Sequence, residues 1–190
     1  TVNYTEVLDS REPSFTRFHR EQVNIKPAVE DQFRGIVRQA YDYSCGSAAL
    51  TTLLNGYVGT RLTEQQTMNG LLRFGEYNRI VERRSFSLLD MKRFVTALGL
   101  ESGGYRGEFS DLIKQGQPAI VPISYAGFKH FVVYKAYKNG RVYVADPALG
   151  NISFDQERFK EIWENNTLFL INVPEAQRQN MLALQDADMR

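Results

Sequence analysis

The chain has 190 residues, of which 43% are hydrophobic and 24% charged, and its formal net charge is +1. A chain of this length can form one globular domain that buries roughly 70% of the surface its unfolded form exposes. The near-neutral charge gives no electrostatic reason to expect a nucleic-acid partner. One cysteine and two histidines are too few for an internal disulfide or a structural zinc site, and no apolar run is long enough to span a membrane. The composition therefore predicts a protein without metal, cofactor or membrane span.

The amino-terminal residues 1–38 are polar and irregular, and Pro13 and Pro27 disfavour a long helix there. We interpret residues 1–35 as an arm that wraps a domain over residues 36–173. Because the chain begins at Thr1 rather than Met, we expect that a native leader has been removed. The polar tail over residues 174–190 is expected to be weakly helical, disordered or a docking segment.

Two helices are predicted after the arm. The first covers residues 45–55, and Gly56 stands where a left-handed cap would end it. The second begins at Thr63, which forms a capping-box pattern with Gln66, and it ends near Gly75.

A third helix begins at Ser87 and ends at Gly99. Its apolar residues follow the spacing of a buried face, and they are Leu88, Met91, Val95 and Leu98. The Gly103-Gly104 pair after this helix is interpreted as a turn between helix and strand.

The second half of the chain is dominated by predicted strands. They cover residues 118–124, 130–137, 141–146 and 167–173. Asn139-Gly140 joins two of them in a hairpin, a short helix precedes them at residues 111–115, and Asp155 caps a helix that carries Phe159, Ile162 and Trp163. A helical half followed by an antiparallel sheet predicts an α+β fold.

Cys45, the single cysteine, lies where a loop becomes an apolar helix. A free thiol is only a few per cent thiolate at neutral pH, so a catalytic cysteine needs activation. The amino-terminus of a helix and a histidine partner would both lower its pKa, and Gly46 would let a substrate backbone approach closely. Taken alone, a lone cysteine is more often a small buried hydrophobe.

The two histidines differ in their surroundings. His19 lies among charged residues of the arm, where a solvated surface position is the better interpretation. His130 begins an apolar strand after a loop, so that its side chain can face a cleft at the strand end. A buried histidine with a structural role is the alternative.

Asp146 ends the strand that pairs with the strand of His130. Counting back from the two-residue turn pairs Tyr134 with Ala145 and places Asp146 a few residues from His130 across the pair. Pro147 favours a break there, although an aspartate before a proline is in isolation more often a turn former. Nucleophile, base and orienting carboxylate then occur in the order Cys, His, Asp.

Gln39 precedes Cys45, and its side-chain amide can donate to the oxyanion that forms when a thiolate attacks a carbonyl. An ordinary loop glutamine is the alternative. The chain also contains three further motifs, Cys45-Gly-Ser-Ala-Ala-Leu50, His130-Phe-Val-Val133 and Val144-Ala-Asp146-Pro-Ala-Leu-Gly150. With these motifs the chain resembles the C39 peptidases, a family of papain-like cysteine proteases, over residues 36–173. The resemblance is specific because four separated motifs occur in the family's order.

The resemblance implies a papain-like fold in which an amino-terminal helical half packs on a carboxy-terminal antiparallel sheet. It also implies a thiol peptidase with Cys45 as nucleophile, His130 as general base and acid, Asp146 as orienting group and Gln39 in the oxyanion hole. Its partner would be a protein or peptide substrate.

Many C39 peptidases are domains of bacteriocin exporters that cut leader peptides after a double glycine. This chain differs in having no transporter segments and in carrying Ser44 where those domains usually have aspartate. Residues 37–45 and 84–92 resemble stand-alone C39 proteins of Gram-negative bacteria, some of which are encoded with functional-amyloid export systems. That resemblance implies a secreted substrate or export component and favours a periplasmic over a cytoplasmic location.

Three functions therefore follow from the sequence. The leading hypothesis is a cysteine endopeptidase. A thiol acyltransferase or amidase on the same fold is the second, because a Cys-His-Asp triad indicates acyl transfer rather than a particular substrate. A peptide-binding module without catalysis is the third.

Overall fold

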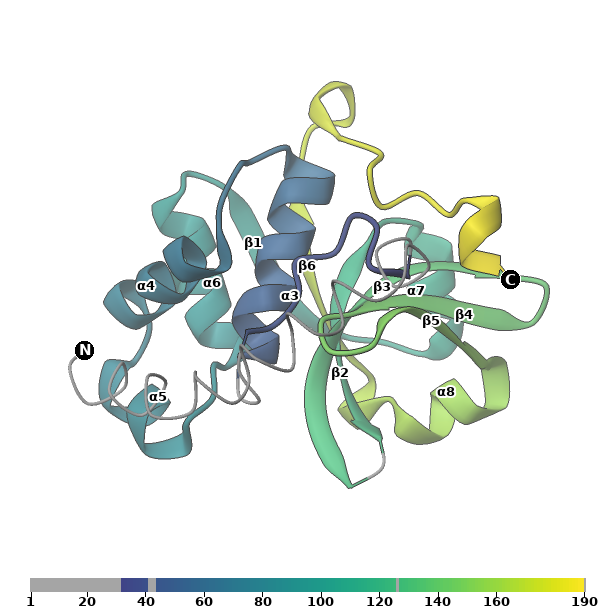
Figure 1. The fold of residues 1–190 in the computed structure, drawn as a ribbon, viewed down its shortest axis with the longest axis horizontal. Coiled ribbons are helices and arrows are strands. Elements are labelled where there is room, and N and C mark those ends of the chain that lie inside the picture. The colour runs from purple at the N-terminus through teal and green to yellow at the C-terminus, as the bar shows by residue number, and fades with distance from the viewer. Residues whose placement is uncertain (1–31, 41–43, 126, 190) are drawn as a thin grey trace, which may run out of the picture.

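The computed structural model describes residues 32–40, 44–125 and 127–189. A helical half packs against an antiparallel sheet, which confirms the predicted α+β, papain-like arrangement (Figure 1). The helices are α3 (Cys45–Leu53), α4 (Glu64–Phe74), α5 (Tyr77–Arg83), α6 (Leu88–Ala97), α7 (Phe109–Gln115) and α8 (Gln156–Ile162). The strands are β1 (Glu101–Arg106), β2 (Ala119–Tyr125), β3 (Phe128–Lys138), β4 (Arg141–Asp146), β5 (Gly150–Asp155) and β6 (Thr167–Asn172).

The six strands form one sheet in the order β1-β6-β2-β3-β4-β5. Helices cover both faces, so the apolar core has two parts. Helices α3, α4 and α6 pack on one face against Ile120, Val133 and Phe169. Helices α7 and α8 pack on the other face against Val121 and Val144. None of the helices in the described part of the chain is long and apolar enough to cross a lipid bilayer.

Helix α3 is the central helix of the first core, and every residue from Gly46 to Leu53 is buried. It begins at Cys45, as predicted, but it continues through a π-helical turn, Leu54–Val58, and ends at Gly59, whose φ is 96°. The predicted cap at Gly56 is therefore wrong. A Cβ at Gly56 would lie 2.6 Å from the Cγ of Leu182, so this glycine allows the carboxy-terminal tail to pack closely instead.

The predicted starts of α4 and α6 are confirmed, because Thr63 and Ser87 each form a capping box. The predicted buried face of α6 is wrong at its last position. Leu98 is 40% exposed, and Phe94, on the same face as Met91, is buried in its place.

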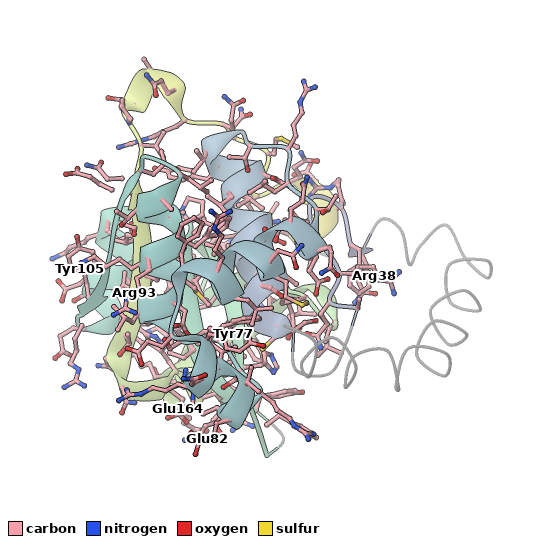
Figure 2. All side chains as sticks on the ribbon, turned by 90° about the vertical axis from the view of Figure 1, so that its left-hand side faces the viewer. Arg38, Tyr77, Glu82, Arg93, Tyr105 and Glu164 are labelled. Atoms are coloured by element: carbon pink, nitrogen blue, oxygen red, sulfur yellow. The ribbon has the colours of Figure 1, made fainter. Side chains whose placement is uncertain are left out.

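Helix α5 and strands β1 and β5 have no counterpart among the predicted elements. The Gly103-Gly104 pair lies inside β1, where it faces Leu170 and Phe169 of β6, so the predicted turn is wrong. Because glycine is depleted in strands, the Gly103-Gly104 pair does not indicate a strand at this point of the sequence. Tyr105 follows the pair and is exposed at the surface of the molecule (Figure 2).

The hairpin of β3 and β4 contains a β-bulge. From the Asn139-Gly140 turn back to Ala136 the pairing follows the predicted register, but Tyr134 then faces Val144. The predicted pairing of Tyr134 with Ala145 is therefore wrong. Lys135 is the extra residue, and a two-residue turn gives no sign of a bulge farther along the strand.

The bulge decides which face of the sheet carries His130. Opposed residues of an antiparallel pair project to the same face, and a shift of one residue exchanges the faces. Beyond the bulge, the observed register puts His130 and Asp146 on the same face. If the pairing counted back from the Asn139-Gly140 turn continued without a bulge, His130 and Asp146 would lie on opposite faces of the sheet.

The bulged residue is attached to the carboxy-terminal tail. The Lys135 side chain is 2% exposed, and its Nζ donates to Oδ1 of Asn151 at 2.9 Å and to Oδ2 of Asp188 at 3.2 Å. Asp188 also accepts two hydrogen bonds from Nη2 of Arg34, at 2.7 and 2.8 Å. The end of the tail thus packs on the sheet and on the segment that leads to Gln39.

The domain boundaries at residues 35 and 173 stay a prediction, and the arm lies largely outside the described residues.

Asp90 joins the start of α6 to the turn before α5. Its side chain is buried and accepts hydrogen bonds from the amide of Glu76 at 2.9 Å and from the amide and hydroxyl of Ser87 at 2.8 and 2.9 Å. Buried donors that lose their acceptor each cost about 1–3 kcal/mol. We expect Asp90→Ala to lower the free energy of unfolding by about 2–4 kcal/mol, measured by urea denaturation.

Glu82→Ala is the control for Asp90→Ala. Glu82 is an exposed carboxylate at the surface of α5 (Figure 2), so its removal should change the free energy of unfolding by less than about 0.5 kcal/mol. Equal effects of the two substitutions would contradict the role assigned to Asp90.

Candidate active site

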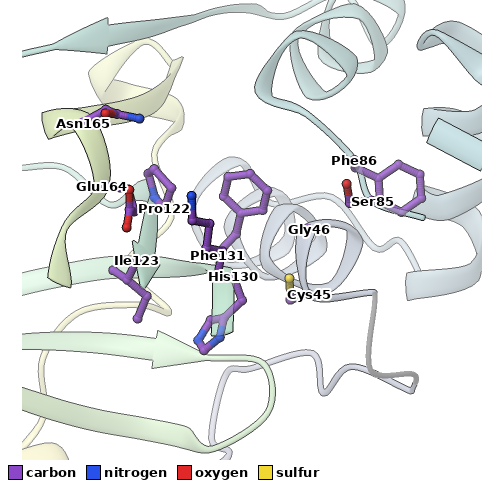
Figure 3. Close-up of a pocket in the computed structure, with 11 residues that line it drawn as sticks. Cys45, Gly46, Ser85, Phe86, Pro122, Ile123, His130, Phe131, Glu164 and Asn165 are labelled. Atoms are coloured by element: carbon purple, nitrogen blue, oxygen red, sulfur yellow. The ribbon is translucent and has the colours of Figure 1, made fainter. Parts of the chain in front are cut away.

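A pocket of about 290 Å³ lies beside Cys45, between the helical half and the sheet (Figure 3). Cys45 and His130 both line it. Much of its wall is apolar and comes from Phe86, Pro122, Ile123 and Phe131, whereas Lys129, Glu164 and Asn165 are polar. The sheet and α3 therefore place the predicted nucleophile and the predicted base at one cavity.

Gly46, which follows Cys45, packs against three side chains. A Cβ at this position would lie 3.3 Å from Met91 and 3.4 Å from Phe86 and Phe131. The glycine thus lets the first turn of α3 approach its neighbours closely. Its predicted contact with a substrate backbone stays a prediction.

The pKa of the Cys45 thiol lies above its usual value. Burial raises it most, a hydrogen bond with the backbone of Phe131 opposes this rise, and the charge of Asp146 adds to it. The backbone at the helix amino-terminus, at Cys45 and Gly46, does lower this pKa as predicted, but burial outweighs it and the net shift is upward. The resting thiol is protonated at neutral pH and needs a base before it can act as a nucleophile.

His130 is bound to Asp146. Nε2 of His130 lies 3.0 Å from Oδ2 of Asp146, and the two side chains are 17% and 1% exposed. The other carboxylate oxygen, Oδ1, accepts from the amides of Ala148 at 2.8 Å and Leu149 at 3.1 Å. The turn after β4 thus fixes the carboxylate, and the carboxylate fixes the ring. With Nε2 engaged, Nδ1 is the ring nitrogen left to exchange a proton.

Gln39 lies next to the same turn. Its backbone amide donates to the carbonyl of Pro147 at 3.0 Å, and Nε2 of Gln32 donates to the carbonyl of Leu149 at 2.7 Å. The segment that carries Gln39 is therefore held against the residues that follow Asp146. The role of the Gln39 side chain in an oxyanion hole stays a prediction. Residues 41–43, which connect this segment to Ser44, and His19 lie outside the described residues.

Glu64, the first residue of α4, is a partly buried carboxyl group near Cys45 that no sequence motif indicates. Burial raises its pKa to about 7, and hydrogen bonds from Ser44, from the amide of Ala40 and from Ser47 oppose this rise. A glutamate in the first turn of a helix is so common that nothing in the residue pattern marks Glu64 as partly buried.

We expect the contribution of Glu64 to the stability of the protein to fall as the pH rises from about 4.5 to 7. The folded state holds the Glu64 proton more tightly than the unfolded state, whose glutamate has a pKa near 4.5, so ionisation disfavours folding above that value. The shift of the Glu64 pKa from 4.5 to about 7 corresponds to a decrease of about 3 kcal/mol in the free energy of unfolding once Glu64 is ionised. Urea denaturation of the native chain and of Glu64→Gln should show a flatter profile for the variant in this pH range. Parallel profiles would contradict the raised pKa.

A cysteine at the amino-terminus of a buried helix, with a histidine and an aspartate on the adjoining antiparallel sheet, is the arrangement of papain-like cysteine peptidases. The chain belongs to the Peptidase C39 family, which its residues 34–175 match. The chain is thus a member of a family of cysteine peptidases.

Two curated relatives are each described as a probable functional amyloid protease FapD. The protein of Pseudomonas aeruginosa is 40% identical over 142 residues, and that of Pseudomonas fluorescens is 33% identical over 142 residues. In both comparisons the alignment covers 75% of this chain and 62% of the relative. The chain thus spans less than two thirds of the length of these relatives.

Solved structures agree on the fold. A double glycine motif protease from an AMS/PCAT transporter, in complex with the leader peptide, is 28% identical with a TM-score of 0.60, covering 72% of this chain and 89% of its own. The peptidase domain of Streptococcus ComA is 18% identical with a TM-score of 0.58, covering 73% and 98%.

Proposed function

We propose that this protein is a cysteine endopeptidase in which Cys45, His130 and Asp146 form the catalytic triad. The observation that carries the proposal is that Cys45 and His130 line one pocket while Nε2 of His130 is held 3.0 Å from Oδ2 of Asp146. This arrangement gives a protonated thiol, a base whose Nδ1 is not engaged by Asp146, and a fixed carboxylate that orients the base.

The reaction begins with the transfer of the Cys45 proton to His130. The thiolate attacks the carbonyl carbon of the scissile peptide, and a carbon–sulfur bond forms while the carbonyl oxygen becomes an oxyanion. The Gln39 side chain donates to this oxyanion. Asp146 stabilises the imidazolium that His130 has become.

The tetrahedral intermediate collapses when the carbon–nitrogen bond breaks and His130 returns its proton to the leaving amine. Water then attacks the thioester, and His130 accepts a proton from that water. The carbon–sulfur bond breaks, the peptide acid leaves, and the Cys45 thiol is restored.

The proposed substrate is a secreted protein, or a component of its export machinery, in functional-amyloid biogenesis. The 40% identity to a probable functional amyloid protease supports this role. A periplasmic location is part of the same proposal, because an exported substrate would meet the protease there. The similarity to a double glycine motif protease with a bound leader peptide supports cleavage after a glycine or another small residue. The polar and apolar walls of the pocket suit an extended peptide that places one apolar side chain beside Phe86 and Phe131.

The test is an incubation of the purified protein with secreted proteins co-expressed with it, followed by mass spectrometry of new termini. We expect new termini after small residues with the native chain and none with Cys45→Ala. The same termini with both proteins would contradict the proposal. Transfer of a trapped acyl group to an amine rather than to water would instead indicate an acyltransferase.

A further inference from the structure

We propose that Glu64 is a positioning residue that holds Gln39 at a fixed distance from Cys45. This inference rests on the proposed function, since it assigns Gln39 and Cys45 to one reaction. It starts from the position of Glu64, whose carboxylate contacts both ends of the segment that connects those two residues.

The first contact is with the residue that follows Gln39. Oε2 of Glu64 accepts a hydrogen bond from the backbone amide of Ala40 at 3.1 Å. The backbone amide of Gln39 is itself bound to the carbonyl of Pro147 at 3.0 Å. Two consecutive amides are thus fixed by α4 and by the turn after Asp146, so the Gln39 backbone has little freedom to move away from the site.

The second contact is with the residue that precedes Cys45. Ser44 is fully buried and occupies the N-cap position of α3, yet among the described residues its hydroxyl caps no amide of that helix. Serine at this position usually accepts a hydrogen bond from the first turn. Hydrogen bonding from the Ser44 side chain is among the interactions that lower the pKa of Glu64 against the effect of burial.

Ser47, in the first turn of α3, completes the contact between the two helices. Its Oγ donates to the carbonyl of Ser44 at 2.9 Å and lies 3.5 Å from Oε1 of Glu64. A single carboxylate therefore joins the oxyanion segment and the first turn of the nucleophile helix. These partners offset part of the cost of partly burying the Glu64 carboxylate, because burial disfavours its charge.

Three variants test the role of Glu64. Glu64→Ala removes every contact and should lower kcat for peptide cleavage by about 10–100-fold with KM changed by less than about twofold, since a misplaced oxyanion donor affects the transition state rather than substrate binding. Glu64→Gln keeps an acceptor for the Ala40 amide and should retain kcat within about threefold. Gln65→Ala, at the exposed next position of α4, is the matched control and should leave kcat unchanged.

A double-mutant cycle with Gln39→Ala separates positioning from a general loss of structure. If Glu64 acts through Gln39, Glu64→Ala should lower kcat by less than about threefold in the Gln39→Ala background. Equal effects in both backgrounds, or an unchanged kcat in Glu64→Ala, would overturn the proposal. Turnover that persists in Cys45→Ala would instead overturn the proposed function.

Amide hydrogen exchange tests the contact without any peptide substrate. We expect faster exchange at Ala40 in Glu64→Ala and unchanged exchange in Gln65→Ala, because only the first variant removes the acceptor of that amide. The same exchange at Ala40 in the native chain and in Glu64→Ala would also overturn the proposal.

Discussion

Replacing Cys45 with alanine is expected to lower the rate of peptide cleavage by at least about 10⁴-fold, because removal of a nucleophile leaves only substrate binding and oxyanion stabilisation. The free energy of unfolding should change little, since the side chain is small and only partly buried. Kinetics with a peptide substrate and urea denaturation measure the two effects. Cys45→Ser should be nearly as inactive, because a serine hydroxyl is much less acidic than a thiol. Activity within tenfold of the native chain in Cys45→Ala would exclude the thiol as nucleophile.

The raised pKa of Cys45 can be tested by the rate at which an alkylating agent labels the thiol at different pH values. In the peptide-free protein an alkylating agent should label Cys45 slowly at neutral pH, and the rate should rise as the pH passes the ordinary thiol value of 9.0. Fast labelling at neutral pH that is lost in His130→Ala would show that a thiolate–imidazolium pair already exists at rest.

Replacing Asp146 with asparagine is expected to lower kcat by about 10³–10⁴-fold while the protein stays folded. Asparagine keeps the oxygen that accepts from the amides of Ala148 and Leu149, so the turn should persist. Its amide nitrogen would replace Oδ2 opposite Nε2 of His130, and it cannot accept a proton there, so the ring would change its tautomer or orientation.

Two comparison variants define this effect. His130→Ala should lose at least as much activity as Asp146→Asn. Asp146→Ala should lose activity and also about 1–3 kcal/mol of stability, because two turn amides then lack an acceptor. Steady-state kinetics and urea denaturation of the three variants measure both quantities. An Asp146→Asn variant with kcat within threefold of the native chain would show that the carboxylate is not needed to orient His130.

Local chemistry made much of the fold predictable. The helix caps at Thr63, Ser87 and Asp155 are predictable because each side chain accepts a hydrogen bond from a backbone amide in the first turn of its helix. The three helices begin where these caps predict. Strand β1 was not predictable in the same way. Its Gly103-Gly104 pair has low strand propensity, and only pairing with β6, far away in the sequence, makes it a strand.

The candidate site was predictable where residue type and order carry the chemistry. Cys45, His130 and Asp146 were selected in this way, and the last two lie in contact. Glu64 was not selected, because its importance comes from burial and from Ser44 and Ala40, neither of which marks it in the sequence. The direction of the Cys45 pKa was missed for the same reason, since burial is a property of the packed fold.

The β-bulge at Lys135 sets the register of β3 against β4 near the site and thereby fixes the face of the sheet on which His130 lies. If Lys135 instead paired with Val144, every residue from Tyr134 back to His130 would shift by one position, and His130 would lie on the face opposite Asp146. A homologue could change many side chains between the bulge and His130 and keep the site, but a gain or loss of one residue there would separate its base from its carboxylate. Alignments of this hairpin are therefore best judged by the spacing between the bulge and the histidine, and less by the identity of the residues in between.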